Sequence, residues 1–296
     1  MRGRCWHKEL VLVGAIMTRP ERDSDNPMNP SRLAALEGTA SSSHWSFRGN
    51  EGNPATRGGR AILPLFCRKS SNEYELVGTG FYVDPNGMLV TAKHVAEKLV
   101  DDCRGVAEAT TIHILGDGRY LQRRVNQFHL HSSSDIAVGL PEEIIENKSG
   151  LPVRCEYLTM KTSLPEIGSP VATWSYPLHR ITSMPDGGTE IELDPTFYDG
   201  IYLKYFAKGG PSVKLNPPYC LTNIHLHGAS SGGPIFDTTG NVVGIASSSY
   251  DGQTDVSYFT PIMPIMEIEI AVSFVRGEEP KRMLFYELAA RQVLFK

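Results

Sequence analysis

Short apolar runs separated by turn-forming residues follow one another from residue 61 onwards. Six of them have the length of strands, and the turn Asp84-Pro85-Asn86-Gly87 favours a hairpin between two of them. These six runs are 61–66, 75–83, 88–91, 110–115, 120–128 and 136–139. Together they predict a first antiparallel barrel at about residues 60–140.

A second series of short runs follows a crossing segment at 139–168. Its members are 171–175, 190–193, 201–206, 222–227, 242–247 and 257–260. They predict a second barrel at about residues 165–262. The sequence therefore indicates an all-β protein with two antiparallel six-stranded β-barrels.

Both ends of the chain depart from this pattern. Residues 19–59 are rich in Pro, Ser, Asn and Gly with little periodic hydrophobicity, so we expect residues 1–58 to form a disordered leader before a domain at 59–296. The apolar run Leu10–Met17 superficially resembles a signal sequence, but it lacks an Ala-x-Ala cleavage pattern and is far too short to span a bilayer. The sequence leans toward a cytoplasmic location.

The tail at 264–296 carries mixed signals. Pro264–Arg276 fits a helix or a strand, because Glu267–Ile270 alternates between charged and apolar residues. Pro280 suits the first residue of a helix, and Leu284, Phe285, Leu288 and Ala289 follow at helical spacing. We therefore expect a C-terminal helix, and no room for a further domain.

Charge and cysteine content narrow the class of protein. The 29 Lys and Arg residues nearly balance the 33 Asp and Glu residues, so neither nucleic acid nor an acidic membrane is indicated as a partner. The five cysteines form no C-x-x-C pair. The sequence predicts free thiols in a reducing compartment, with no cofactor and no metal.

The segment Gly228–Pro234, with the sequence Gly-Ala-Ser-Ser-Gly-Gly-Pro, is the first candidate for chemistry. Its glycines allow a tight turn that presents the hydroxyl of Ser231 to a substrate. An ordinary turn between two strands would look the same. The decision depends on whether the chain also supplies a base and a carboxylate.

One candidate for each lies upstream. His94 stands in Thr91-Ala92-Lys93-His94-Val95, and Asp135 opens the apolar run of Ser134-Asp135-Ile136-Ala137-Val138. Alone, the histidine fits a core or surface residue and the aspartate fits a turn cap. Together with Ser231 they follow the chain order His, Asp, Ser, which is the order of the chymotrypsin-type triad.

These three motifs resemble the trypsin-like serine peptidases, and most closely the bacterial type with short loops that includes the high-temperature-requirement proteases. The resemblance covers roughly residues 60–265 and leaves no room for their PDZ module. It implies that Ser231 is the nucleophile, His94 the base and Asp135 the residue that orients His94. It also implies an oxyanion hole made of the backbone N–H groups of Ala229 and Ser231, although trypsins have glycine where this chain has Ala229.

The resemblance further implies a substrate pocket. His225, six residues before the nucleophile, would lie at its base, and Ser247, Ser248 and Ser249 would form its wall. Without an aspartate at the base, a preference for Arg or Lys is not implied. His225 and His227 would share one face of a strand, where wall packing is favoured over a metal pair because no third ligand is evident.

Two functions remain open from the sequence. The first is a serine endopeptidase that acts on a protein or peptide substrate. The second is a catalytically silent, protease-fold binding protein.

Overall fold

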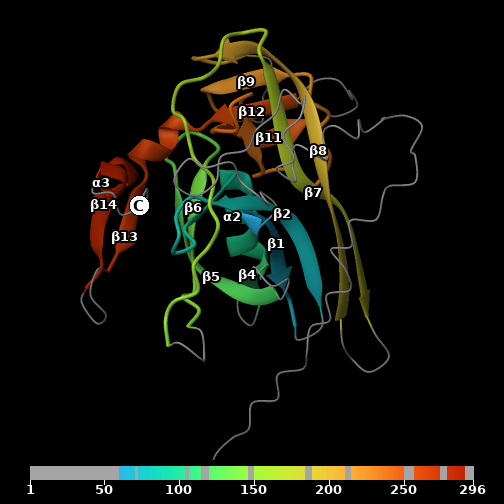
Figure 1. The fold of residues 1–296 in the computed structure, drawn as a ribbon, viewed down its shortest axis with the longest axis vertical. Coiled ribbons are helices and arrows are strands. Elements are labelled where there is room, and N and C mark those ends of the chain that lie inside the picture. The colour runs from blue at the N-terminus through green and yellow to red at the C-terminus, as the bar shows by residue number, and fades with distance from the viewer. Residues whose placement is uncertain are drawn as a thin grey trace, which may run out of the picture.

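The computed structural model describes residues 60–70, 73–103, 107–114, 120–145, 150–183, 189–210, 215–249, 257–273 and 279–290. Two closed antiparallel barrels lie one above the other (Figure 1). The predicted fold class is therefore confirmed. The predicted leader at residues 1–58 lies outside the described residues.

The first barrel closes in the order β1-β2-β3-β6-β5-β4. Its strands are β1 (Ile62–Arg68), β2 (Tyr74–Tyr82), β3 (Leu89–Thr91), β4 (Glu108–Ile114), β5 (Tyr120–Leu130) and β6 (Ala137–Pro141). Each predicted run of this half overlaps one of them. The Asp84–Gly87 turn also forms: Asp84 accepts the backbone N–H of Met88, and Gly87 has a φ of 96°.

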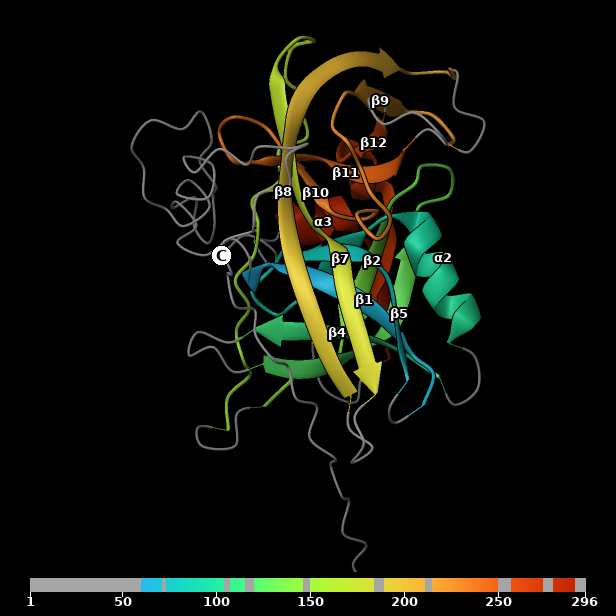
Figure 2. The same cartoon turned by 90° about the vertical axis from the view of Figure 1, so that its right-hand side faces the viewer.

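A ten-residue helix, α2 (Lys93–Asp102), follows β3 and packs against the first barrel (Figure 2). The helix starts before His94, and Val95, Ala96 and Leu99 bury one face against the barrel. Because β3 and α2 are joined directly, His94 emerges at the rim where the strand ends.

The second barrel closes in the order β10-β11-β12-β9-β8-β7. Its strands are β7 (Pro170–Ser183), β8 (Thr189–Phe206), β9 (Tyr219–Thr222), β10 (Pro234–Phe236), β11 (Val242–Ser249) and β12 (Ser257–Pro261). Sequence analysis reached the same number of strands through two errors that cancel. It split β8 into two, and it missed β10, whose three residues are too few for a periodic signal.

The strands β7 and β8 continue beyond their barrel as a ribbon that lies over β1 and β2 (Figure 2). Ile191 and Leu193 of this ribbon are buried. Apolar residues of both barrels, including Leu65, Tyr176 and Ile245, belong to one continuous hydrophobic cluster. The interface between the barrels is therefore part of the core, and groups that meet across it are held by that packing.

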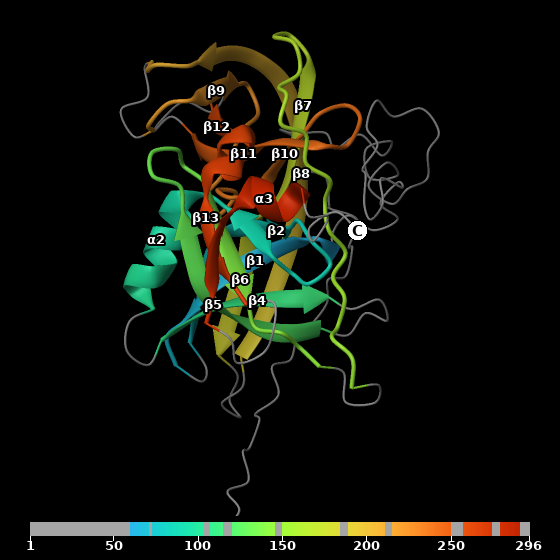
Figure 3. The same cartoon turned by 90° about the vertical axis from the view of Figure 1, so that its left-hand side faces the viewer.

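The C-terminal segment combines both alternatives left open by its sequence. It forms the 3-10 helix η3 (Met263–Glu267), the hairpin of β13 (Glu269–Val272) and β14 (Lys281–Leu284), and the short helix α3 (Phe285–Ala290). The prediction that Pro280 begins a helix is wrong, because a strand follows it. Figures 1 and 3 show the segment beside β5 and β6 of the first barrel. In agreement, the cavity between them is lined by Leu130 and Leu284.

Candidate active site

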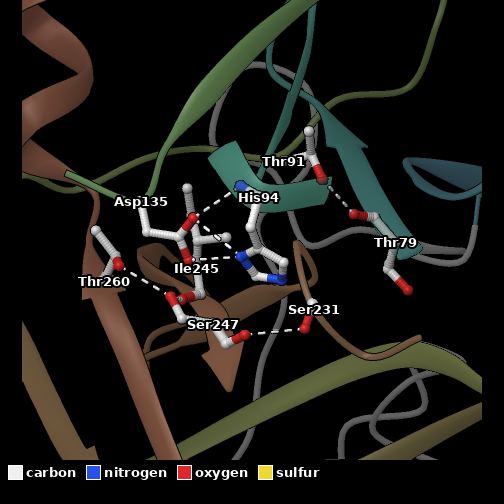
Figure 4. A network of polar contacts seen from close by, with 8 residues as sticks. All are labelled: Thr79, Thr91, His94, Asp135, Ser231, Ile245, Ser247 and Thr260. Carbon is white, nitrogen blue, oxygen red and sulfur yellow. Dashed lines mark hydrogen bonds and ion pairs between the residues drawn. The ribbon is translucent and has the colours of Figure 1, made fainter. Parts of the chain in front are cut away.

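His94 and Asp135 are joined by three contacts at the rim of the first barrel, two from the His94 ring and one from its backbone N–H. The His94 Nδ1 atom lies 3.0 Å from Oδ1 and 2.9 Å from Oδ2 of Asp135, and the His94 backbone N–H donates to Oδ1 at 3.0 Å. Asp135 is 8% exposed, whereas the His94 side chain is 46% exposed. The imidazole therefore has one nitrogen fixed by a buried carboxylate while its other edge faces the side where Ser231 lies (Figure 4).

The environment of Asp135 favours its ionised form. Burial alone would raise the pKa of this carboxyl group, but hydrogen bonds from His94, the charge of His94 and a hydrogen bond from the Ser247 hydroxyl lower it. The net pKa lies below the ordinary value for aspartate. Asp135 is thus an anion at neutral pH, as a group that stabilises an imidazolium must be.

Ser231 lies on the turn between β9 and β10, in the second barrel. Its hydroxyl donates a hydrogen bond of 2.9 Å to the backbone oxygen of Ser247 in β11 (Figure 4). Within the described part of the chain, no hydrogen bond joins Ser231 to His94. For a proton transfer to His94, the hydroxyl must leave the Ser247 oxygen. A rotation about one side-chain bond changes the direction of the hydroxyl.

Ala229 and Ser231 each have a backbone N–H group with no backbone acceptor among the described residues. The N–H groups of Ser230, Gly232 and Gly233, in contrast, donate to backbone oxygens at 3.2, 2.7 and 3.0 Å. N–H groups that are not used within the fold can stabilise a negatively charged oxygen that forms beside them.

Ala229 adopts a left-handed backbone conformation with a φ of 61°, and among the described residues it is the only one other than glycine to do so. A Cβ in this region costs about 1–2 kcal/mol relative to the right-handed conformation. Sequence analysis noted that trypsins have glycine where this chain has Ala229. The structure shows that this position has the positive φ that glycine adopts most easily. The turn keeps the N–H group of Ala229 at the expense of local strain.

Thr79, on β2 of the first barrel, fastens the strained turn across the interface. Its backbone N–H donates to the Ser231 oxygen at 2.8 Å, and its hydroxyl donates to the Ala229 oxygen at 2.8 Å. The same hydroxyl accepts the N–H of Tyr176 at 3.2 Å. Thr79 is completely buried, so these bonds are sheltered from water.

Gly232 makes this approach of the two barrels possible. Its φ is 89°, and a Cβ there would overlap the Thr79 oxygen and the Thr91 hydroxyl. Ser230, also completely buried, accepts a hydrogen bond of 3.0 Å from the Ser175 hydroxyl. Neutral hydrogen bonds thus hold the described part of the turn, with no charged group at residue 230.

Two histidines of the region proposed for the substrate pocket, His225 and His227, lie next to each other in space. His225 and His227 lie beyond the end of β9 rather than on a strand, so the strand predicted at 222–227 is misplaced and shares only Thr222 with β9. Their ring centroids nevertheless lie 4.1 Å apart, and the tilted ring of Tyr198 lies against His227 at a centroid distance of 5.3 Å. Burial, followed by the neighbouring His225, lowers the pKa of His227.

The three serines of β11 complete the sequence-derived set. Ser247 is 1% exposed, and its hydroxyl contacts Thr260 at 2.8 Å, on the side of the site where Asp135 lies (Figure 4). Ser248 and Ser249 follow it on the strand, and their side chains lie outside the described residues. No sequence signal set Ser247 apart from its neighbours.

Neither a metal site nor a membrane-spanning helix is found among the residues that the structure describes. No group of three or more His, Cys, Asp or Glu side chains is placed to hold a metal ion. No helix in that part is long and apolar enough to cross a membrane. Four cysteines of that part, Cys67, Cys103, Cys155 and Cys220, are free thiols.

Comparisons with known proteins agree with this geometry. A family model described as "Trypsin-like peptidase domain" matches residues 78–245, which include His94, Asp135 and Ser231. A search of curated proteins found no match. Among solved structures, the chain is similar to Deg5, with 18% identity, a TM-score of 0.51 and coverage of 69% of this chain and 84% of that one.

A second similar structure is the active form of the Rv3671c protease from M. tuberculosis. It shares 15% identity, with a TM-score of 0.46 and coverage of 80% of this chain and 82% of that one. At 18% identity, the likeness to Deg5 concerns the fold alone.

Proposed function

The chain belongs to the family of trypsin-like peptidases, and from this premise we propose that it is a serine endopeptidase with His94, Asp135 and Ser231 as its catalytic triad. The observation that carries the proposal is the fixed His94–Asp135 pair, with its imidazole directed toward the Ser231 turn (Figure 4). A buried carboxylate that holds the Nδ1 side of an imidazole leaves Nε2 free to act as a base.

In the proposed reaction, Ser231 attacks the carbonyl carbon of the scissile peptide bond while His94 Nε2 takes the hydroxyl proton. The carbonyl oxygen becomes an oxyanion, and the N–H groups of Ala229 and Ser231 stabilise it. His94 then gives its proton to the leaving amine, which leaves an acyl group on Ser231. Water, activated by the same imidazole, releases the acid and restores the serine.

One observation favours the alternative, a protease-fold binding protein without turnover. The Ser231 hydroxyl donates to the Ser247 oxygen rather than to His94. Catalytic hydrogen bonds are often long or misaligned before a substrate binds, so this geometry does not remove the enzyme from consideration. The two functions differ in whether Ser231 can be made to react.

An active-site fluorophosphonate probe separates the two functions. A serine peptidase reacts covalently with the probe at its nucleophile, and the label disappears in Ser231→Ala. The matched control is Ser230→Ala, which removes the neighbouring, buried hydroxyl but leaves the nucleophile. If the folded protein takes up no label under reducing conditions, the binding function is favoured and the enzymatic proposal fails.

The proposed primary pocket has His225 where a trypsin-type preference for Arg or Lys needs an acidic group. We therefore propose that small, polar or acidic side chains are preferred on the amino-terminal side of the cleaved bond. A peptide library reports this preference directly. Dominant cleavage after Arg or Lys would contradict it and would indicate an acidic group that reaches the pocket from elsewhere.

The proposed enzyme needs no newly formed amino terminus. Trypsin-type activation pairs an inserted ammonium group with an aspartate before the nucleophile, and this chain has Ser230 there, bonded to Ser175. An inserted charge would be buried without a partner. The full-length chain and a form that starts at Gly59 should turn over equally. A full-length chain that stays silent until it is cut would refute this.

A further inference from the structure

His131 immediately follows β5 and stands four residues before Asp135. It is 5% exposed. Its Nδ1 atom accepts the backbone N–H of Ser134 at 2.8 Å and that of Ser133 at 3.2 Å. Because a ring nitrogen accepts a hydrogen bond only when it carries no proton, the proton of a neutral His131 must be on Nε2.

The rest of the loop is closed around this ring. The N–H of His131 donates to the Ile136 oxygen at 3.0 Å, and the N–H of Ile136 donates to the Ser134 oxygen at 2.9 Å. These bonds flank Asp135 on both sides. The direction of the Asp135 side chain therefore depends on a loop whose inner acceptor is the imidazole of His131.

Lys93 supports the same loop from outside. Its ammonium group donates to the His131 oxygen at 2.9 Å and to the Ser132 oxygen at 3.3 Å. Lys93 directly precedes His94 at the start of α2. The loop that carries Asp135 is thus tied to the helix that carries His94, independently of the contact between the two side chains.

We propose that His131 is a positioning residue for Asp135 and performs this task only as a neutral imidazole. This inference rests on the function proposed above and adds to it a second histidine on which activity depends. Protonation turns Nδ1 from an acceptor into a donor, so the N–H groups of Ser133 and Ser134 lose their acceptor at once. The loop then rearranges and Asp135 no longer fixes His94.

The charges around His131 act in both directions. Lys93, from α2, disfavours a second positive charge nearby. Glu267, from η3, favours it, since its Oε2 atom lies 3.6 Å from His131 Nε2. Asp135, on the same loop, also favours it. The Nε2 atom is buried, with no hydrogen-bond partner among the described residues.

Two substitutions of His131 distinguish the loss of its hydrogen-bond acceptor from the uptake of a proton. In His131→Asn, the Oδ1 atom replaces Nδ1 as the acceptor for the backbone N–H two residues on, and it does not take up a proton near neutral pH. In His131→Leu, the acceptor is lost at every pH. Comparing the two variants with the wild type isolates the effect of the proton from the effect of the hydrogen bonds.

The measurement is the pH profile of kcat/KM. In the wild type, the proposed reaction requires both His94 and His131 to be neutral, so the logarithm of kcat/KM should fall on the acid side more steeply than a single titrating group allows. His131→Asn should retain activity at neutral pH with a slope of about one. His131→Leu should lose kcat on the order of 10–100-fold with little change in KM. Identical acid limbs in wild type and His131→Asn would overturn the proposal.

A second readout does not depend on turnover. In isotope-labelled Ser231→Ala protein, imidazole NMR should find His131 as the Nε2–H tautomer at neutral pH, and the amide resonances of Ser133 and Ser134 should shift as His131 titrates. An Nδ1–H tautomer, or amides that ignore this titration, would refute the inference. If the wild type neither cleaves nor labels, the proposed function fails while this test still decides the role of His131.

Discussion

The two barrels hold their parts of the site in different ways. In the first barrel, Asp135 receives the backbone N–H of His94 as well as its ring, so both residues of the pair belong to one barrel, and the Ser247 hydroxyl of the second barrel adds a further hydrogen bond. In the second barrel, Ser231 lies on a turn that contains a strained alanine. That turn is fastened by Thr79, which belongs to the other barrel.

This difference indicates which part of the site should respond most to a change at the interface between the barrels. The His94–Asp135 pair depends mainly on contacts within the first barrel, whereas the Ser231 turn depends on contacts with Thr79 of the other barrel. A change at the interface between the barrels should therefore affect the proposed nucleophile and oxyanion donors before it affects the proposed base. The following experiments test this division, from the largest expected effect to the smallest.

Removing either partner of the proton transfer tests whether the two barrels act as one unit. Ser231→Ala and His94→Ala should each lower kcat on the order of 10⁴–10⁶-fold, and the double variant should be little worse than either. Steady-state kinetics on a peptide substrate measure these losses. If His94→Ala kept turnover within about tenfold of the wild type, the base would be another group.

Thr79 tests the fastening across the interface. Thr79→Val keeps the shape but loses the hydroxyl that holds the Ala229 oxygen, so we expect kcat to fall on the order of 10–100-fold with little change in KM. Thr79→Ser is the matched control, because it keeps the hydroxyl and should stay within a few-fold of the wild type. Equal losses in both variants would point to packing rather than to the hydrogen bond.

His113, buried in the first barrel, tests how that barrel responds to acid. Burial, assisted by the charge of Arg123, lowers the pKa of His113 to about 4. The unfolded chain takes up a proton near pH 6.5, and the folded one does not until near pH 4. As the pH is lowered from about 6.5 to about 4, the free energy of unfolding should therefore fall, by about 3 kcal/mol at most.

Urea unfolding of the wild type and of His113→Gln at a series of pH values measures this effect. The substitution removes the titrating group, so its curve should fall less steeply over the same window. The comparison of slopes is independent of any loss of stability that the substitution causes at neutral pH. Two parallel curves would show that His113 does not contribute to acid sensitivity.

Ala229→Gly tests the strain in the second barrel. Glycine adopts a φ of 61° without a Cβ penalty, so the free energy of unfolding should rise by about 1 kcal/mol, partly offset by the greater freedom of glycine in the unfolded chain. Ala92→Gly is the control, because Ala92 has a φ of −72° and glycine there should destabilise. A less stable Ala229→Gly protein would show that the turn carries no strain.

Much of the fold was determined by the sequence itself. The six runs of the first barrel, the hairpin turn at Asp84–Gly87 and the all-β class follow from alternation and turn chemistry, which are local properties. The order of His94, Asp135 and Ser231 could also be found in the sequence, because each stands in a short motif beside an apolar run. The errors fell where the local signal is short or ambiguous, as at β10, β8 and Pro280.

Tertiary structure alone decided how those residues act together. Three features arise where the two barrels meet: the partner of the Ser231 hydroxyl, the left-handed conformation of Ala229 and the hydrogen bonds of Thr79. A periodic pattern of apolar residues does not specify contacts between distant segments. His131 differs from other histidines only in what its Nδ1 atom accepts. A hydrogen bond depends on distance and direction in space, so the chain specifies these partners only once packing has brought them together.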